Sequence, residues 1–435
     1  MRALRWLVLS GLTGVCLAAP PPSRAAEPLR LSVDEAAAMA LERNHEVLRA
    51  RERLSMLEGQ VVEVKSQVYP QVGLEAGYRR YYDESFLDLF PAFARPEVKN
   101  GYSLKTTLEQ VLFSWGRVST AVEIARVSRR QAAQDLAAAE RRIKLQVHQA
   151  FYDLLLARRL VEVAEETLAQ RKRHLEVAEK RYEAGVVNEF EVVRARVDVA
   201  NARTPVIQAR NRVRQAAARL NNLLAREQSA PIEPVGDLEY VPMEELDLGT
   251  VVARAVKQRP ELASLRIARE IAEKNLALAR AEDKPTVALR AEYGFVTEEF
   301  ENLNPNREQW TVGVSMSLPL FDGWRTRGKV AQALSHLRDV RIAEDQLRQA
   351  IELEAKVALD DLRVAEEIIR AASLNIDRAR RAVELAEASY RYGVGTTLDV
   401  TDAQLGLTAA RTDHAQALHD YMVARARLLA VMNEL

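Results

Sequence analysis

The sequence predicts a mainly α-helical protein with a small β part, in which two tandem repeats each form long antiparallel coiled-coil helical hairpins and insert a two-stranded β-hairpin. Three observations predict this fold class. The chain aligns with itself at a fixed offset, apolar residues recur at heptad spacing through its long central segments, and four short stretches alternate between apolar and polar side chains.

The composition suits long helices better than a compact enzyme, because 48% of the 435 residues are hydrophobic, 29% are charged and only 6% are aromatic. The 62 basic and 62 acidic side chains cancel. No overall field then attracts the chain to nucleic acid or to an acidic lipid surface, so we expect no nucleic-acid partner.

Residues 1–25 are predicted to be a secretory signal peptide. Two arginines lie within the first five residues, an apolar stretch and three prolines follow, and Ser-Arg-Ala at 23–25 offers a small-x-small cleavage site. The apolar stretch is too short to span a bilayer, so a leader cleaved after Ala25 or Ala26 is favoured over a membrane anchor.

The only cysteine, Cys16, lies inside this segment. A lipoprotein signal needs a leucine-like residue three positions before the cysteine and a small residue directly before it, and Thr13 and Val15 do not match. We therefore expect no lipid at Cys16. The mature chain then lacks cysteine, which excludes disulfides and thiol catalysis.

The internal similarity divides the mature chain into a first repeat at 26–225, a proline-containing linker at 226–248 and a second repeat at 249–435. The central segments align at an offset of 208, so that YEAGV at 182–186 matches YRYGV at 390–394.

The N-terminal part of each repeat aligns at an offset of 215 instead, as Glu46 with Glu261. The difference of seven residues falls between two predicted strands. A longer loop in the first repeat, at 79–101 against 296–309, accounts for it.

A heptad stripe with alternate steps of four and three residues runs along the central segment of each repeat. In the first repeat it consists of Ile143, Val147, Ala150, Leu154, Ala157, Val161, Ala164, Leu168, Arg171, Leu175, Ala178 and Tyr182. In the second it consists of Ile351, Ala355, Ala358, Leu362, Ala365, Ile369, Ala372, Ile376, Ala379, Val383, Ala386 and Tyr390. An ordinary coiled coil without a repeat does not explain why register, tyrosine and the following glycine recur together.

Each repeat is interpreted as helix, strand, loop, strand, very long helix, glycine turn and helix. In the first repeat the helices are expected at 33–67, 117–183 and 189–224. The long helix would extend over ~100 Å and the other two over ~50 Å each, so two shorter helices laid end to end match the long one. This match predicts a row of long helical hairpins that lie side by side, here called the palisade.

The four alternating stretches have the length and pattern of tilted strands that cross an outer membrane. Their apolar positions are Val72, Leu74, Ala76 and Tyr78, then Tyr102, Leu104 and Leu108, then Val287, Leu289, Ala291, Tyr293 and Phe295, and finally Trp310, Val312, Val314, Met316 and Leu318. Alternation alone fits two soluble hairpins equally well. Membrane strands are favoured because aromatic residues gather at the loop ends, as an interfacial girdle does: Tyr78, Tyr102, Tyr293, Phe295 and Trp310.

Four strands cannot close around a lumen. An open sheet edge cannot lie in hydrocarbon either, because each unpaired N–H or C=O group costs several kcal/mol there. Several subunits must therefore pool their strands, and the sequence alone does not choose their number.

These features resemble the TolC-type outer-membrane efflux family over essentially the whole mature chain. The similar motifs are Pro70 at a helix-to-strand corner, LFSWGR at 112–117, PLFDGW at 319–324, and Tyr390-x-x-Gly393 followed by LDVTDA at 398–403. The resemblance implies a homotrimer with a 12-stranded β-barrel in the outer membrane and an α-barrel in the periplasm. It also implies a channel for efflux or type I secretion that meets an inner-membrane pump through a periplasmic adaptor.

The resemblance further implies a gate at the periplasmic end, closed by inward coiling of the helices, with acidic rings facing the lumen. Asp399 and Asp402 match these rings and share one helix face at i, i+3. Alternatively, both are solvated acids in the first turn of a helix, where the helix dipole favours negative charge. Glu191 and Tyr390 match residues of the closed-state contacts.

The resemblance assigns the tip turns of the hairpins to adaptor docking. Gly185, Gly393 and Gly395 mark these turns. Gly395 falls where some family members have an arginine, so the ionic part of a closed-state latch is not expected here.

An enzyme is not supported by the motifs, because the sequence has no G-x-S-x-G, P-loop, G-x-G-x-x-G or H-E-x-x-H. The six histidines are scattered without metal-ligand spacing, so we expect no catalytic residues, metal or cofactor. The alternative function is a periplasmic coiled-coil adaptor or structural protein of an export complex. Such a protein would need one hairpin with flanking all-strand domains.

Overall fold

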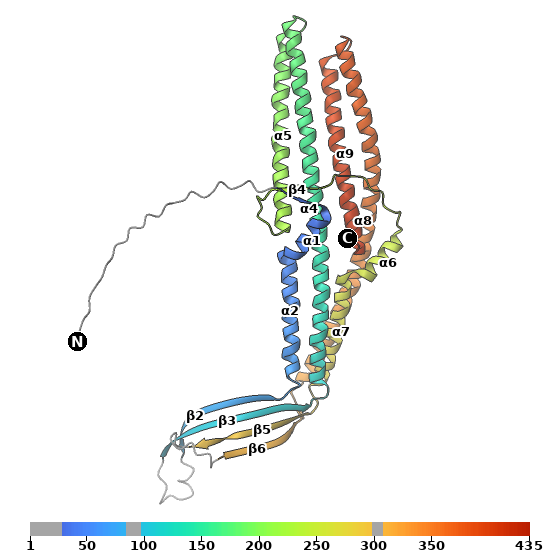
Figure 1. The fold of residues 1–435 in the computed structure, drawn as a ribbon. Coiled ribbons are helices and arrows are strands. Elements are labelled where there is room, and N and C mark those ends of the chain that lie inside the picture. The colour runs from blue at the N-terminus through green and yellow to red at the C-terminus, as the bar shows by residue number, and fades with distance from the viewer. Residues whose placement is uncertain (1–27, 84–96, 298–307) are drawn as a thin grey trace, which may run out of the picture.

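The computed structural model describes residues 28–83, 97–297 and 308–435, and it confirms a mainly α-helical fold with two tandem repeats. The predicted signal peptide at 1–25, with Cys16, lies outside the described residues. The molecule is elongated, with helical hairpins that rise from one end of a tilted sheet (Figure 1).

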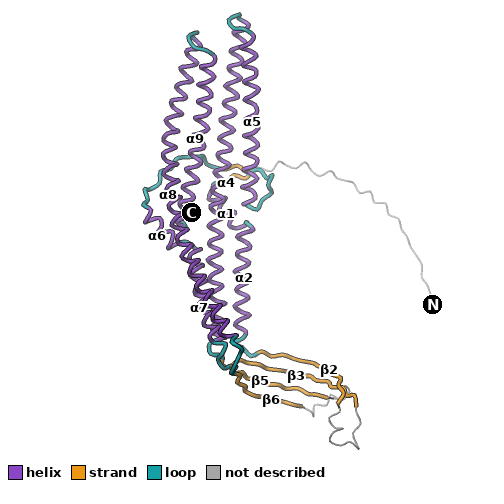
Figure 2. The backbone as a smooth tube through the Cα atoms, turned by 180° about the vertical axis from the view of Figure 1, so that it is seen from behind, coloured by secondary structure: helices purple, strands orange, loops and turns teal. Residues whose placement is uncertain are grey.

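Both repeats have the same order of helices. The first contains α1 (Val33–Arg43), α2 (His45–Ser66), α4 (Arg117–Glu183) and α5 (Glu189–Leu223). The second contains α6 (Leu248–Gln258), α7 (Pro260–Arg280), α8 (Arg325–Arg391) and α9 (Thr397–Met432). The long helices α4 and α8 have 67 residues each, and α2 and α5 lie end to end beside α4 (Figures 1 and 2). The expected palisade is therefore present.

The helix expected at 33–67 is two helices, because the chain bends at Asn44. The Asn44 side chain caps the start of α2, and its Nδ2 donates to the Leu223 carbonyl oxygen at 2.9 Å, at the end of α5. The second repeat bends at Arg259, whose Nε donates to the Val431 carbonyl oxygen at 3.0 Å. Leu223 and Val431 are equivalent at the offset of 208, so both repeats tie the bend to the same place on their last helix.

Four strands form one antiparallel sheet in the order β2-β3-β5-β6. They are β2 (Gln71–Asp83), β3 (Glu97–Phe113), β5 (Thr286–Thr297) and β6 (Glu308–Ser317). The loop predicted at 79–101 was wrong at both ends, because β2 continues to Asp83 and β3 begins at Glu97. Backbone pairing between the two strands continues there without the apolar alternation on which the sequence prediction depended.

A short parallel pair was not predicted. Strand β1 (Leu29–Leu31) pairs with β4 (Ile232–Pro234), which lies within the linker at 226–248. This pair joins the start of the first repeat to the linker about halfway along the molecule (Figure 1).

The predicted heptad stripes form the seams of the two hairpins, which are α4 with α5 and α8 with α9. All stripe positions are buried or half-buried except Tyr182, at the tip. The equivalent residues Ile143 and Ile351 are 1% and 0% exposed, and each belongs to the apolar core of its own repeat. Burial of these stripes holds each hairpin together.

Candidate functional site

The tips of the two hairpins are closed by the same backbone turn. Gly185 and Gly393 have φ of 70° and 77°, in the left-handed region that glycine adopts without steric cost. In the first tip, the Gly185 N–H donates to the Tyr182 carbonyl oxygen at 2.9 Å and the next N–H reaches Arg181. The second tip repeats both bonds, so each long helix ends in a Schellman motif.

Gly395 makes the second tip tighter than the first. Its N–H donates to the Ser389 carbonyl oxygen at 3.0 Å, a bond added to those of the shared turn. A Cβ at this position would lie 2.9 Å from the Ser389 Cβ and 3.1 Å from the Tyr390 nitrogen. The turn therefore requires glycine at this position.

Glu191 and Asp399 occupy equivalent positions, the third residue of the helix that follows each tip, but their side chains are used differently. The Asp399 carboxylate accepts from the Thr396 backbone N–H at 2.8 Å, and the Asp399 backbone N–H donates to the Thr396 hydroxyl at 3.2 Å, which together form a capping box. The Thr396 hydroxyl also donates to the Asp399 carboxylate at 2.7 Å. These hydrogen bonds lower the pKa of Asp399 below its ordinary value. Glu191 instead accepts from the Thr397 hydroxyl at 2.9 Å and so links the first hairpin to the second.

Asp399 and Asp402 both lie exposed on α9, one turn apart. The Asp402 carboxylate makes no hydrogen bond or ion pair with any other residue that the structure describes. The exposed position fits the alternative of solvated acids at a helix start, and it equally leaves both carboxylates accessible to the solution. Their predicted role in cation selectivity stays a prediction.

Tyr390, on α8 of the second hairpin, contacts α4 of the first hairpin. The Arg181 guanidinium lies 4.7 Å from the centre of the Tyr390 ring, and the His174 ring lies 6.1 Å from it, both carried by α4. Burial, followed by the charge of Arg171, lowers the pKa of His174. Sequence analysis singled out Tyr390 but missed Arg181 and His174, because a sequence does not show which helix faces lie opposite each other.

A cavity of about 530 Å³, here called the tip cavity, lies between α4, α8 and α9 beside these contacts. Its lining includes Arg173, His174, Arg181, Tyr390 and Gln404. Gln404 is 3% exposed, and its amide oxygen has no hydrogen-bond partner among the described residues. The hairpins are thus incompletely packed against each other near their tips.

Further down, α4 meets α9 through polar contacts. The Thr167 and Thr408 hydroxyls lie 3.2 Å apart, and His419 Nε2 lies 2.8 Å from an oxygen of Asp153. Burial alone would lower the pKa of His419, but hydrogen bonds to Asp153 and Asp420 outweigh it and raise the pKa. The interface between the hairpins therefore combines these polar contacts with apolar contacts, since Ala426, Leu418 and Met422 of α9 pack against the core of the first repeat.

The strand register brings the four predicted apolar faces onto one side of the sheet. Residues directly opposite in an antiparallel sheet share a face, and Tyr78 is opposite Tyr102, Ala291 opposite Leu108, and Tyr293 opposite Trp310. This face is largely uncovered, with Leu74 72% and Trp310 73% exposed.

The five predicted girdle residues lie on this apolar face. Tyr293, Phe295 and Trp310 lie near the loop ends of their strands, whereas Tyr78 and Tyr102 lie inside β2 and β3, five residues from the ends at Asp83 and Glu97. The Tyr78 and Tyr102 ring centres are 5.1 Å apart, and Tyr293 is the cross-strand neighbour of Trp310. Phe295, half-buried, lies opposite Leu104. The aromatic band at a membrane interface stays a prediction.

The opposite side of the sheet is polar. Cross-strand neighbours there include Glu75 with Lys105 and Glu109 with Arg290. A sheet with one continuous apolar face and one charged face separates lipid from water, or a protein core from water.

Within the described residues, none of the helices is long and apolar enough to cross a membrane. The same part of the chain holds no cluster of three or more His, Cys, Asp or Glu side chains suited to a metal ion.

Comparisons with known proteins agree with this architecture. The family described as "Outer membrane efflux protein" matches residues 36–226 and 251–434. Protein CyaE of Bordetella pertussis is 26% identical over 418 residues, which covers 96% of this chain and 86% of CyaE. Alkaline protease secretion protein AprF of Pseudomonas aeruginosa is 32% identical over 176 residues, which covers 40% of this chain and 36% of AprF.

The crystal structure of the outer membrane protein VceC from Vibrio cholerae has the same fold. It superposes with a TM-score of 0.78 at 19% identity, covering 92% of this chain and 95% of VceC. The family match includes most of both repeats, with only the linker region between its two parts. The chain therefore belongs to the outer membrane efflux protein family.

Proposed function

We propose that three copies of the chain form a passive exit duct in the cell outer membrane, with a 12-stranded β-barrel in the lipid and an α-barrel that extends into the periplasm. The observation that carries this proposal is the four-stranded sheet with an uncovered apolar face. Lipid would cover that face. Strands β2 and β6 each lack a second neighbour among the described residues, and pairing with further copies would satisfy their free backbone groups.

The polar face of the sheet would then line an aqueous lumen. Its glycines, serines and paired charges, such as Glu75 with Lys105, tolerate water and need no apolar cover. The helices continue this conduit toward the periplasm, since their charged faces stay hydrated while their seams are buried. The duct itself would carry out no chemistry.

The hairpin tips would dock a periplasmic adaptor that joins the duct to an inner-membrane pump, in a tripartite efflux or type I secretion system. Four apolar side chains near the two tips support this, because they are more than half exposed: Val186, Phe190, Val394 and Leu398. Uncovered apolar groups at the end of a long hairpin favour a protein partner.

The tips would also form the gate. Glu191 and Tyr390 hold the second hairpin against the first, while Asp399 and Asp402 would place a ring of carboxylates at the entrance of the assembled duct. Such a ring favours cations and repels itself when the entrance narrows.

Extraction from membranes tests the proposal. Purified outer membranes are washed with sodium carbonate and then solubilised in mild detergent, and the detergent complex is sized by light scattering. We expect the protein to resist carbonate and to run as a trimer that dissociates on heating. Release by carbonate would instead favour the alternative, a periplasmic adaptor or structural protein.

A further inference from the structure

The tip cavity carries an excess of positive charge. Arg173 and Arg181 of α4 and Arg391 of α8 line it, so both hairpins contribute guanidinium groups. None of the three makes an ion pair with any residue that the structure describes, and Arg181 contacts the Tyr390 ring instead. Glu387 is the one carboxylate among the described residues of the lining. Three cations against one carboxylate leave a net charge of +2 on the cavity wall.

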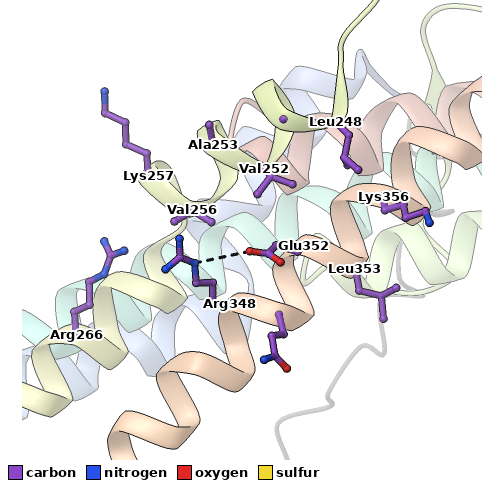
Figure 3. Close-up of a pocket in the computed structure, with 12 residues that line it drawn as sticks. Leu248, Val252, Ala253, Val256, Lys257, Arg266, Arg348, Glu352, Leu353 and Lys356 are labelled. Atoms are coloured by element: carbon purple, nitrogen blue, oxygen red, sulfur yellow. Dashed lines mark ion pairs between the residues drawn. The ribbon is translucent and has the colours of Figure 1, made fainter.

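A larger cavity of about 1010 Å³, beside α6, α7 and α8, shows the contrast (Figure 3). Both arginines that line it have carboxylate partners. Arg348 Nε lies 3.8 Å from an oxygen of Glu352, and Arg266 Nε lies 3.5 Å from an oxygen of Glu344. The Lys257 side chain points away from the pair drawn in Figure 3. The arginines of the tip cavity differ, because they have no such partners among the described residues.

Apolar and aromatic side chains form much of the remaining wall of the tip cavity. They are Val177, Val400 and the rings of His174 and Tyr390, whose centres lie 6.1 Å apart. Burial lowers the pKa of His174, so its ring is neutral near pH 7 and adds no charge. The volume of about 530 Å³ lies within the range of small-molecule sites. The wall therefore suits a ligand that has an apolar body and a negative charge.

One buried polar group of the wall lacks a partner. The Gln404 side-chain nitrogen donates to Glu387 Oε1 at 3.4 Å, but the amide oxygen of Gln404 has no hydrogen-bond partner among the described residues. Buried amide oxygens in folded proteins nearly always have a donor. The wall is thus arranged for a partner that the described chain does not supply.

The charges also affect how the hairpins meet. Guanidinium groups on α4 and on α8 repel each other across the cavity, which opposes contact between the tips. A carboxylate placed between Arg181 and Arg391 would accept hydrogen bonds from both and turn the repulsion into attraction. An aromatic body attached to that carboxylate would pack against the Tyr390 ring and the two valines.

We propose that the tip cavity binds a small aromatic carboxylate, which contacts Arg181 of the first hairpin and Arg391 of the second. The ligand reaches both arginines only while the hairpins lie together, so it stabilises joined tips over separated tips. Ligand binding therefore lowers the open probability of the duct. The binding site itself does not depend on the exit duct, whereas the effect on opening rests on the gate proposed above.

Isothermal titration calorimetry tests the site. The purified wild-type oligomer in detergent is titrated with 2-naphthoate and with uncharged 2-naphthamide, which has the same shape, and detergent alone is the blank. We expect one naphthoate per chain, bound roughly ten-fold more tightly than the amide and less tightly at higher salt. Arg181→Gln combined with Arg391→Gln should weaken naphthoate binding roughly ten-fold.

Arg203→Gln combined with Arg380→Gln is the matched control, because it also removes one arginine from each hairpin, at exposed positions outside the cavity. This control should bind naphthoate as the wild type does. Arg391→Gln alone removes no side-chain contact within the described residues, and it should still weaken binding roughly three-fold even if the double variant fails to assemble. Equal affinity for naphthoate and naphthamide, or unchanged affinity in Arg391→Gln, would overturn the anion site.

Single-channel recording separates the site from its effect on opening. Naphthoate should lower the open probability of the wild type and leave that of the Arg181→Gln, Arg391→Gln variant unchanged. Binding in the calorimeter without any change in open probability would overturn the effect on opening and leave the site in place. A wild-type oligomer that conducts no ions would overturn the duct and the effect on opening together, while the calorimetry would still decide the site.

Discussion

The contacts between the hairpin tips give a quantitative prediction for gating. The double variant Glu191→Ala with Tyr390→Leu removes the hydrogen bond from Thr397 at 2.9 Å and the contact with Arg181 at 4.7 Å. We expect the tips to separate more readily in this variant, which raises the open probability of single channels.

The magnitude follows from the two contacts. A hydrogen bond to a half-buried carboxylate contributes about 1 kcal/mol, and a partly exposed cation–π contact contributes about 0.5–1 kcal/mol. Together they amount to about 1.5–2 kcal/mol per subunit, which corresponds to a change of roughly 10- to 30-fold in the population of joined tips.

Recordings in planar lipid bilayers measure this change. Glu189→Ala and Tyr392→Leu are matched controls, because Glu189 precedes the contact on the same exposed turn and Tyr392 is 81% exposed. An open probability that is unchanged in the double variant, or that rises equally in the controls, would refute the assignment of Glu191 and Tyr390 to the gate.

Three further predictions concern the tip, the hairpin interface and the sheet. Gly395→Arg should distort the second tip, because a Cβ there has no room, and hydrogen exchange at the tip should rise while that of the α8 core stays unchanged. His419 has a raised pKa, so its contact with Asp153 stabilises the hairpin interface below about pH 6.5 and is lost as the pH rises through the raised value. The temperature of thermal unfolding should therefore fall at higher pH in the wild type, and His419→Gln should lack that dependence. Gly294→Val should reduce the amount of folded protein in the outer membrane, measured by immunoblot of membrane fractions, because a Cβ at this position would overlap the Leu104 carbonyl oxygen.

The tall hairpins could be predicted from sequence because their cause is local. Heptad spacing around Ile143 and its counterpart Ile351 requires only that apolar residues fall on one helix face. The same stripe occurs in both repeats, so the helix predicted in one repeat supports the helix predicted in the other. The apolar strand faces were predictable for the same reason, since alternation by two residues fixes which side chains share a face.

Features that depend on contacts between distant elements were not predictable. The bend at Asn44 interrupts a stretch with continuous helical character. The Asn44 side chain caps α2 locally, but it also donates to the Leu223 carbonyl oxygen, 179 residues away, a contact that the sequence does not show. The partners of Tyr390 were missed because the rotation of α8 relative to α4 is set by packing. Asp399 shows a related problem, since a carboxylate three residues after Thr396 predicts a capping box as well as a ring at a channel entrance.

Single-channel recording of the purified wild-type oligomer tests the central claim most directly. We predict long-lived ion-conducting pores that prefer cations, and a weaker preference when Asp399→Asn is combined with Asp402→Asn. Unchanged selectivity in that variant would contradict the assignment of these residues to the entrance. A membrane-extracted oligomer that inserts into bilayers but conducts no ions would contradict the exit duct itself.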